Sequence, residues 1–243
     1  MPDAAAIDRV RLFEALSATW PAAEVVRLGP WTLRRGAGGG NRVSAATLEG
    51  EPGDVGEAEA AMRGWGQRPL FQLRPGQEEL DAALAARGYV AQDHSVIYAA
   101  EPAAMAEKGK LAAIPCEAPL ACMVEIWAGG HIGRDRLAVM ARAPEPRTWL
   151  LGRDGDRPAG CAFIAVSGEV AMLSALQVAA QHRRKGLAAR MMRGAAHWAA
   201  RAGADTLGLA VTAGNAPARA LYARLGMAEA AVYHYRIAPE DAP

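Results

Sequence analysis

The chain has 243 residues, a length that allows one large domain or two domains of about 120 residues each. Its 27 basic and 26 acidic residues give a net charge of +1, so the overall charge favours neither nucleic acid nor a membrane surface as a partner. The three cysteines have no C-x-x-C spacing, which argues against a disulfide framework and a zinc site, and we expect no bound metal.

The sequence shows no sign of a targeting or membrane segment. Charges at Asp3, Asp8 and Arg9 interrupt any signal-like apolar core, and no run approaches eighteen uncharged apolar residues. We therefore expect a soluble, cytoplasmic protein that contacts neither membrane nor nucleic acid. The sequence does not indicate an oligomeric state.

The first hundred residues alternate helix and strand signals. The predicted helices are 7–18, 55–65 and 78–87, the last ended by Gly88. The predicted strands are 31–35, 42–48, 70–73 and 90–99, the first two joined by a glycine turn at 38–40. Residues 101–110 have the composition of a linker.

The second half continues with a mixed pattern, typical of an α/β fold. The predicted helices are 119–127, 134–142, 187–202 and 217–225. The predicted strands are 148–152, 160–167, 170–178, 206–211 and 231–237. The first three of these strands are joined by tight turns, which favours antiparallel hairpins.

A shift of 138 residues aligns the segment that starts at Leu80 with the segment that starts at Ala218. Gly88 then falls on Gly226, and each glycine follows an alanine-rich helix and precedes a strand. The identity is weak but the order of elements is the same, which favours two related halves in tandem. Coincidence between two alanine-rich helices is the alternative.

The most informative stretch follows the strand that ends at Val178. A short basic loop leads to Gly186, and a helix begins directly after it. A helix N-terminus offers unpaired N–H groups and a positive dipole end, and a glycine without Cβ lets the backbone approach an anion closely. The pattern predicts a pyrophosphate-binding loop that is neither a Walker loop nor a dinucleotide-binding G-x-G-x-x-G loop. A solvated basic loop is the alternative.

Two motifs resemble those of the GNAT acetyltransferases. Val178-x-x-x-x-Arg183-x-x-Gly186-x-Ala188 is similar to the acetyl-CoA signature of that family, and Asn215 to Met227 is similar to a later motif with a helix-borne tyrosine. Met227 stands where the family usually has an aromatic residue. The resemblance implies a mixed, mainly antiparallel sheet flanked by helices. It also implies a degenerate GNAT-like half at 1–100, a linker at 101–110 and a catalytic domain at 111–243.

The resemblance also implies roles for individual residues. The end of the splayed strand would pair with the pantetheine arm of acetyl-CoA through Leu176, Gln177 and Val178. The pyrophosphate would lie against His182, Arg183, Arg184, Lys185, Gly186, Leu187 and Ala188. Asn215 would touch the cofactor arm, and the Tyr222 hydroxyl would donate a hydrogen bond or a proton to the leaving sulfur.

The general base is not evident. Many family members have a glutamate where this chain has Met172, which cannot take a proton. Glu125, on a predicted helix, and His131, in a glycine-rich loop, are the remaining candidates, and each has a plain surface role as its alternative. Water that relays protons to bulk solvent is a third possibility.

The expected activity is transfer of an acetyl group from acetyl-CoA to a primary amine of a small molecule or a peptide. A CoA-thioester sensor without turnover is the main alternative, because the carboxylate is missing at Met172. An acyltransferase with a larger acyl donor or an oxygen nucleophile is another.

Overall fold

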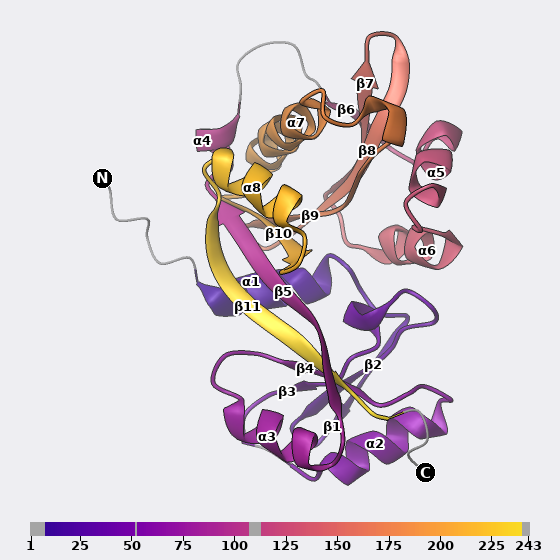
Figure 1. Cartoon of the computed structure of the whole chain (residues 1–243), viewed down its shortest axis with the longest axis vertical. Helices are drawn as coiled ribbons and strands as arrows, with labels where there is room; N and C mark the ends of the chain where they lie inside the picture. The colour runs from indigo at the N-terminus through magenta and orange to yellow at the C-terminus, as the bar shows by residue number, and fades with distance from the viewer. Residues whose placement is uncertain (1–7, 52, 107–112, 240–243) are drawn as a thin grey trace.

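The computed structural model describes residues 8–51, 53–106 and 113–239 (Figure 1). The helices are α1 Arg9–Ala18, α2 Val55–Gly64, α3 Glu78–Ala86, α4 Pro102–Met105, α5 Ala121–Ala128, α6 Arg134–Arg142, α7 Leu187–Arg201 and α8 Ala216–Arg224, with short 3-10 turns η1 Asn41–Val43 and η2 Ala180–His182. The strands are β1 Glu24–Leu28, β2 Trp31–Arg35, β3 Thr47–Leu48, β4 Leu70–Leu73, β5 Val90–Ala100, β6 Ala113–Cys116, β7 Arg147–Asp154, β8 Arg157–Ser167, β9 Val170–Val178, β10 Thr206–Thr212 and β11 Ala228–Ile237.

Within these described ranges the strands form two sheets. One sheet has eight strands in the order β4-β11-β5-β10-β9-β8-β7-β6, and the other has three in the order β1-β2-β3. All neighbouring strands are antiparallel except β9 and β10, which are parallel. This confirms the mixed α/β fold with a mainly antiparallel sheet.

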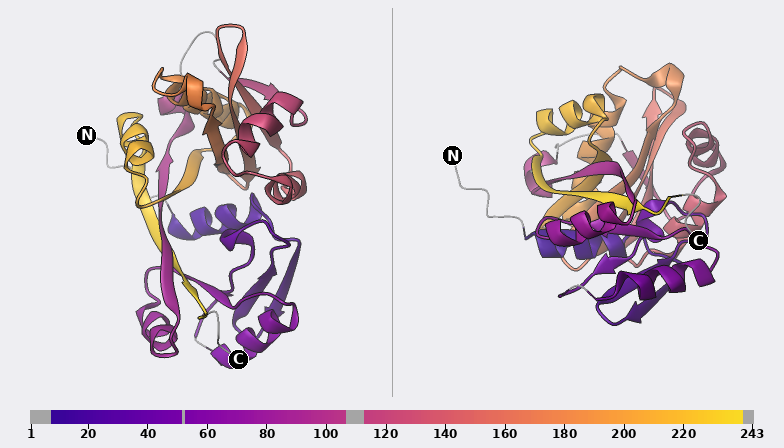
Figure 2. Two further views of the ribbon diagram at one scale, coloured as in Figure 1. Left: turned by 45° about the vertical axis from the view of Figure 1, so that its right-hand side comes forward. Right: turned by 60° about the horizontal axis from the view of Figure 1, so that its bottom comes forward.

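Two long strands join the upper and lower parts of the molecule. β5 and β11 lie side by side and run from the region of α7 and α8 to the region of α2 and α3 (Figures 1 and 2). β5 comes from the first half of the chain, yet it pairs with β10 and β11 of the second half. β11 in turn lies between β5 and β4.

The β4–β11 and β5–β10 ladders have equivalent registers in the two halves of the repeat. Leu73 of β4 pairs with His234, and Val96 of β5 pairs with Val211. The 138-residue shift carries Leu73 onto Val211 and Val96 onto His234, so it maps one ladder onto the other. The two halves therefore exchange strands. The last strand of the first half, β5, pairs with β10 of the second half, and the last strand of the second half, β11, pairs with β4 of the first.

The predicted boundaries at 1–100 and 111–243 stay a proposal about how the chain divides. The eight-stranded sheet is continuous across them, because β5 is paired on both edges by strands of the second half. Residues 101–106 of the predicted linker include α4, and the remainder lies outside the described residues.

The predicted strand at 42–48 is mostly wrong. Asn41–Val43 form a 3-10 turn, in which the Asn41 carbonyl accepts from the N–H groups of Ser44 and Ala45, and only Thr47–Leu48 pair with β2. Local hydrogen bonds of this loop compete successfully with the ladder. β1 and β6 were not foreseen from the sequence; each is an edge strand of its sheet.

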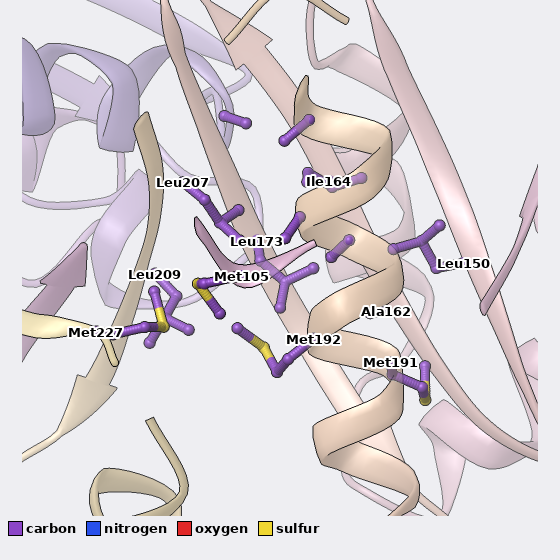
Figure 3. Close-up of a cluster of buried hydrophobic side chains, with 14 of the residues drawn as sticks. Met105, Leu150, Ala162, Ile164, Leu173, Met191, Met192, Leu207, Leu209 and Met227 are labelled. Atoms are coloured by element: carbon purple, nitrogen blue, oxygen red, sulfur yellow. The ribbon is translucent and has the colours of Figure 1, made fainter. Parts of the chain in front are cut away.

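α7 and α1 cover opposite faces of the sheet around β9. Ala171 and Leu173 point to the core under α7, where Met191, Met192 and Leu209 also lie (Figure 3). Val170 and Met172, on the other face of the same strand, pack in a cluster with Leu12 and Leu16 of α1. The N-terminal start of α7 lies close to the sheet, because a Cβ at Gly160 would come within 2.7 Å of the Met191 sulfur.

Candidate active site

β9 and β10 separate halfway along their length. Their parallel pairing covers Val170–Leu173 against Thr206–Leu209 and stops there, although β9 continues to Val178 and β10 to Thr212. In the part of the chain that the structure describes, the edge of 174–178 that faces β10 therefore has no strand partner. Its unpaired backbone groups can hydrogen-bond an extended ligand inserted between the strands.

A bulge in β9 produces this separation. Ser174 pairs with Phe163 and Gln177 with Cys161, so β9 has one residue more than β8 over this interval. Ala175 takes the left-handed conformation, with φ of 54°, and its carbonyl accepts a 2.8 Å hydrogen bond from the indole of buried Trp127. Bulges turn a strand and increase its twist, and they occur often next to functional sites.

The loop after β9 has the geometry of an anion cradle. Gly186 precedes α7 in the left-handed conformation, with φ of 74°, and no side chain caps the helix. The N–H groups of the first turn of α7 are thus free of side-chain partners, and Gly186 itself is exposed. A helix N-terminus of this kind has the chemistry to bind a phosphate group, and the pyrophosphate site stays a prediction.

The structure adds an acidic residue to the basic loop. Asp154, at the end of β7, lies 2.7 Å from Nδ1 of His182 and 3.1 Å from Nζ of Lys185. The hydrogen bond from His182, followed by that from Lys185, holds the pKa of the Asp154 carboxyl below its usual range. Arg183 donates through Nε to the Val178 carbonyl at 3.0 Å, which ties the loop to the strand end. The positive charge of this loop is therefore smaller than the sequence indicated.

A pocket of about 550 Å³ lies at the point where β9 and β10 separate. Ser174, Ala175 and Leu176 line it from β9, while Asn215 and Tyr222 line it from the start and the body of α8. The first half of the chain contributes part of the remaining wall, including Trp20, Asn41, Arg42, Asp93 and Ser95. The site is thus shared between the two halves.

Tyr222 and Asn215 are placed by α8. Tyr222 is 8% exposed, its ring lies 5.6 Å from that of Tyr98, and burial raises the pKa of its hydroxyl to about 12. The Asn215 side chain caps α8 by accepting from the N–H of Ala218 at 3.2 Å, which leaves its amide nitrogen as a donor. The structure therefore brings Leu176, Asn215 and Tyr222 into one pocket.

The two candidate bases lie elsewhere. Glu125 is exposed on α5 and lines a separate pocket with Gln177 and Arg183. His131 is an exposed turn residue with φ of 61°, and it does not line the pocket of Tyr222. Their proposed catalytic role stays a prediction that this placement does not favour.

The absence of a glutamate at Met172 has a structural reason. The Met172 side chain is 1% exposed and packs against α1, so this face of β9 belongs to the core shared with the first half. A carboxylate here would be buried without water, at a large cost in free energy. Ser174, the next residue on this face of β9, is only partly buried.

Sequence reasoning missed the two charged residues of the first half that enter the pocket, Arg42 and Asp93. Arg42 lies 136 residues and Asp93 85 residues before Val178, where the motif begins, and they follow no recognised spacing. The glycine-rich turn beside Arg42 was the sole local signal, and it indicated only a loop.

Residues 117–227 match the family model described as Acetyltransferase (GNAT) family. The match covers somewhat less than half of the chain, and that segment resembles a GNAT acetyltransferase domain. The matched range contains the open edge of β9, the cradle and Tyr222, so the family features lie in the site described above.

Known proteins with a similar sequence or fold agree with this assignment. The streptothricin acetyltransferase of Streptomyces lavendulae is 36% identical over 120 residues, which cover 47% of this chain and 60% of that protein. A second curated relative is matched over 40% of its length, so the similarity spans about half of these proteins. A GCN5-related N-acetyltransferase structure from Kribbella flavida has a TM-score of 0.71 at 21% identity, covering 94% of this chain and 95% of that one.

The two-part architecture also has a solved counterpart. A tandem GNAT protein from the clavulanic acid biosynthesis pathway superposes with a TM-score of 0.56 at 15% identity, covering 90% of this chain and 83% of that chain. At this identity the similarity shows the fold. No helix in the described part of the chain has the length and apolar character to cross a bilayer.

Proposed function

We propose that this protein transfers the acetyl group of acetyl-CoA to a primary amine. The observation that carries the proposal is the continuity of the site. The open edge of β9 begins at Ser174 in the pocket of Tyr222 and ends at Val178, whose carbonyl is bonded to the cradle residue Arg183. A ligand with a pyrophosphate at one end, an extended amide chain and a reactive thioester at the other matches this layout.

Each part of the site then has a binding role. The N–H groups of Gly186, Leu187 and Ala188 bind the pyrophosphate, and exposed Arg184 adds positive charge. The backbone of Leu176 to Val178 hydrogen-bonds the pantetheine arm. Asn215 donates from its amide nitrogen, because its amide oxygen is engaged in capping α8.

The transfer itself forms a carbon–nitrogen bond and breaks the carbon–sulfur bond of the thioester. The attacking amine must be neutral, and the proton it loses passes to water. A backbone N–H of the kinked segment at Ala175–Leu176 stabilises the negative oxygen that develops on the carbonyl.

Tyr222 serves the leaving sulfur. Its pKa of about 12 keeps it neutral at physiological pH, so it is a hydrogen-bond donor. Complete proton transfer to a thiolate whose conjugate thiol has a pKa of about 8.5 would cost roughly 5 kcal/mol. Tyr222 is therefore better suited to stabilise the thiolate by a hydrogen bond than to protonate it fully.

A sensor that binds CoA thioesters without turnover is the second candidate. Buried Met172, in place of a family carboxylate, is the observation that favours it. The two functions differ in one measurable respect, since the enzyme releases free thiol from acetyl-CoA when a suitable amine is present and the sensor does not.

The test combines binding and turnover. Acetyl-CoA is titrated into the protein by calorimetry, and thiol release is then followed with a panel of primary amines. Gly186→Val should weaken acetyl-CoA binding by more than about tenfold, or about 1.4 kcal/mol, because a β-branched side chain is strained at φ of 74° and intrudes on the cradle.

Gly203→Val is the matched control. Gly203 follows the other end of α7, also in the left-handed conformation, with φ of 85° and open space around it. Both variants should lose stability by a similar amount, whereas only Gly186→Val should lose affinity. Equal affinity of the folded Gly186→Val variant and the wild type contradicts the proposed site.

A further inference from the structure

The pocket beside Tyr222 carries an arginine that is not neutralised by the protein. Arg42 is half-buried; its Nη1 lies 3.4 Å from Oγ of Ser174, and its guanidinium lies 5.8 Å from the centre of the Trp20 ring. No described carboxylate comes within 4 Å of it. A half-buried guanidinium with several unused donors is a typical site for a carboxylate ligand.

The same pocket carries a carboxylate whose position is held by the backbone. Asp93 lies in a bulge of β5, where Asp93 and His94 together stand opposite His234. Its φ of 50° turns the residue out of the regular ladder, and Asn41 Nδ2 donates to its Oδ2 at 2.6 Å. Among the described ion pairs none includes Asp93, so its second oxygen is available to a ligand.

The Arg42 and Asp93 side chains line one pocket without forming an ion pair with each other. Arg42 directly follows Asn41, the residue that holds Asp93, so both charged groups are positioned by the same short turn η1. Opposite charges that serve only the fold would gain energy by pairing. Their separation suits a ligand that has both a cation and an anion.

We propose that the acceptor is a zwitterion, a small molecule with a carboxylate close to its reactive amine, and this inference rests on the proposed acetyl transfer. Arg42 binds the carboxylate, and Asp93 hydrogen-bonds the ammonium group before it loses its proton to water. Arg42 contacts Ser174, at the start of the open edge, so the carboxylate is held next to the reacting end of the site. Both charged residues line one pocket of about 550 Å³, a volume that suits an amino acid.

The charges also argue against other classes of amine. Arg136, on α6, lines the same pocket and adds a second positive charge near the first. A polyamine would be repelled by both arginines. An apolar amine would displace water from Arg42 without replacing its hydrogen bonds, and a buried donor left unpaired costs free energy.

The experiment compares amino acids with the amines obtained by removing their carboxylate. The probes are the common L-amino acids, β-alanine and γ-aminobutyrate, each beside its decarboxylated counterpart, with acetyl-CoA at saturation. We expect kcat/KM for at least one amino acid to exceed that for its amine by more than about tenfold, the range for hydrogen bonds to a charged group. Equal or better turnover of the amines overturns the inference, as does turnover of amines but of no amino acid, or of neither.

Two variants test the assigned residues. Arg42→Gln should reduce the ratio of kcat/KM between acid and amine by about 10- to 100-fold. Asp93→Asn should raise KM for every acceptor, and it keeps the turn because asparagine tolerates a positive φ. Arg134→Gln, an exposed neighbour on α6 that does not line the pocket, should leave the ratio unchanged.

The result separates this inference from the proposed function. Calorimetry with acetyl-CoA alone requires no acceptor, so loss of that binding refutes the transferase proposal itself. Normal acetyl-CoA binding with an unchanged acid-to-amine ratio in folded Arg42→Gln refutes only the zwitterionic acceptor.

Discussion

At the residue scale, Tyr222 is a packing residue for which we have proposed a chemical role. Its ring is buried against Tyr98 in the core under α7 and α8, while the residue also lines the pocket between β9 and β10. Among the described side chains, none makes a hydrogen bond with its hydroxyl. Removal of the hydroxyl therefore breaks no described hydrogen bond, so a change in activity can be attributed to the chemical role of the hydroxyl.

Tyr222→Phe should keep acetyl-CoA affinity and lower kcat by about 10- to 1,000-fold, as expected when a group that donates in the transition state is lost. Because such an interaction is made only in the transition state, kcat and kcat/KM should fall together. Steady-state kinetics with an accepted amine and calorimetry with acetyl-CoA measure both quantities.

Tyr98→Phe provides the comparison. It removes the hydroxyl that donates to Glu229 at 2.5 Å, in a neighbouring ring that does not line the pocket. This variant should have the kcat of the wild type. If Tyr222→Phe behaves in the same way, Tyr222 is a packing residue and water serves the leaving sulfur.

At the element scale, an ion pair links the C-terminal end of β11 to α3. Asp81 of α3 accepts from Nε of Arg236 at 2.7 Å, and its other neighbour, Nε2 of His234, lies at 2.8 Å. The hydrogen bond from Arg236, with a smaller contribution from His234, lowers the pKa of the Asp81 carboxyl to about 2. This contact secures the strand that the second half contributes beside β4.

The lowered pKa predicts a pH dependence of stability. A carboxyl with a folded pKa of about 2 and an unfolded pKa of about 3.9 stabilises the fold above pH 4, and this contribution disappears as the pH falls towards 2. Asp81→Asn should lower the free energy of unfolding by about 1–2 kcal/mol at pH 7, after allowance for partial exposure.

Urea denaturation of both proteins between pH 2 and pH 7 measures this difference. The difference between wild type and Asp81→Asn should shrink at the acidic end. Asp156→Asn is a suitable control, because the Asp156 side chain is fully exposed in its pair with Arg153 and should contribute little at any pH. A difference for Asp81→Asn that is constant over the whole range would contradict the assignment.

At the scale of the whole molecule, the exchanged strands make the two halves depend on each other. β5 supplies the partner of both β10 and β11, and α1 covers the face of β9 on which Met172 lies. The pocket beside Tyr222 is likewise built from both halves. We therefore expect the chain to unfold as one cooperative unit.

A fragment of residues 101–243 tests this dependence. Without β5, the facing edges of β10 and β11 lose their shared partner, and the apolar residues under α1 are exposed to water. The fragment alone should lack the circular dichroism and acetyl-CoA binding of the full chain, and co-expression with residues 1–100 should restore both. A 101–243 fragment that folds and binds acetyl-CoA by itself would show that the exchange is dispensable.

Sequence alone was sufficient for features that depend on neighbouring residues. The strand at 170–178, the loop and the helix start at Gly186 form a continuous local unit, and their conformations follow from glycine, helix ends and apolar periodicity. The 138-residue repeat was also visible, because a repeat preserves the order of elements. The helix of the second motif was predicted for the same reason, with Asn215 at its N-cap and Tyr222 within it; the roles of both residues stay predictions.

Only the tertiary structure decided how the two halves interlock and which residues line the pocket beside Tyr222. The insertion of β5 between β10 and β11 depends on pairing between residues more than 100 positions apart, which no local pattern specifies. That pairing brings Asp93 to the pocket, and the turn at Asn41–Val43 brings Arg42 beside it. The loop and helix start proposed to bind the cofactor thus depend on a short stretch of sequence, whereas the pocket proposed to bind the acceptor forms only when strands far apart in the chain pair.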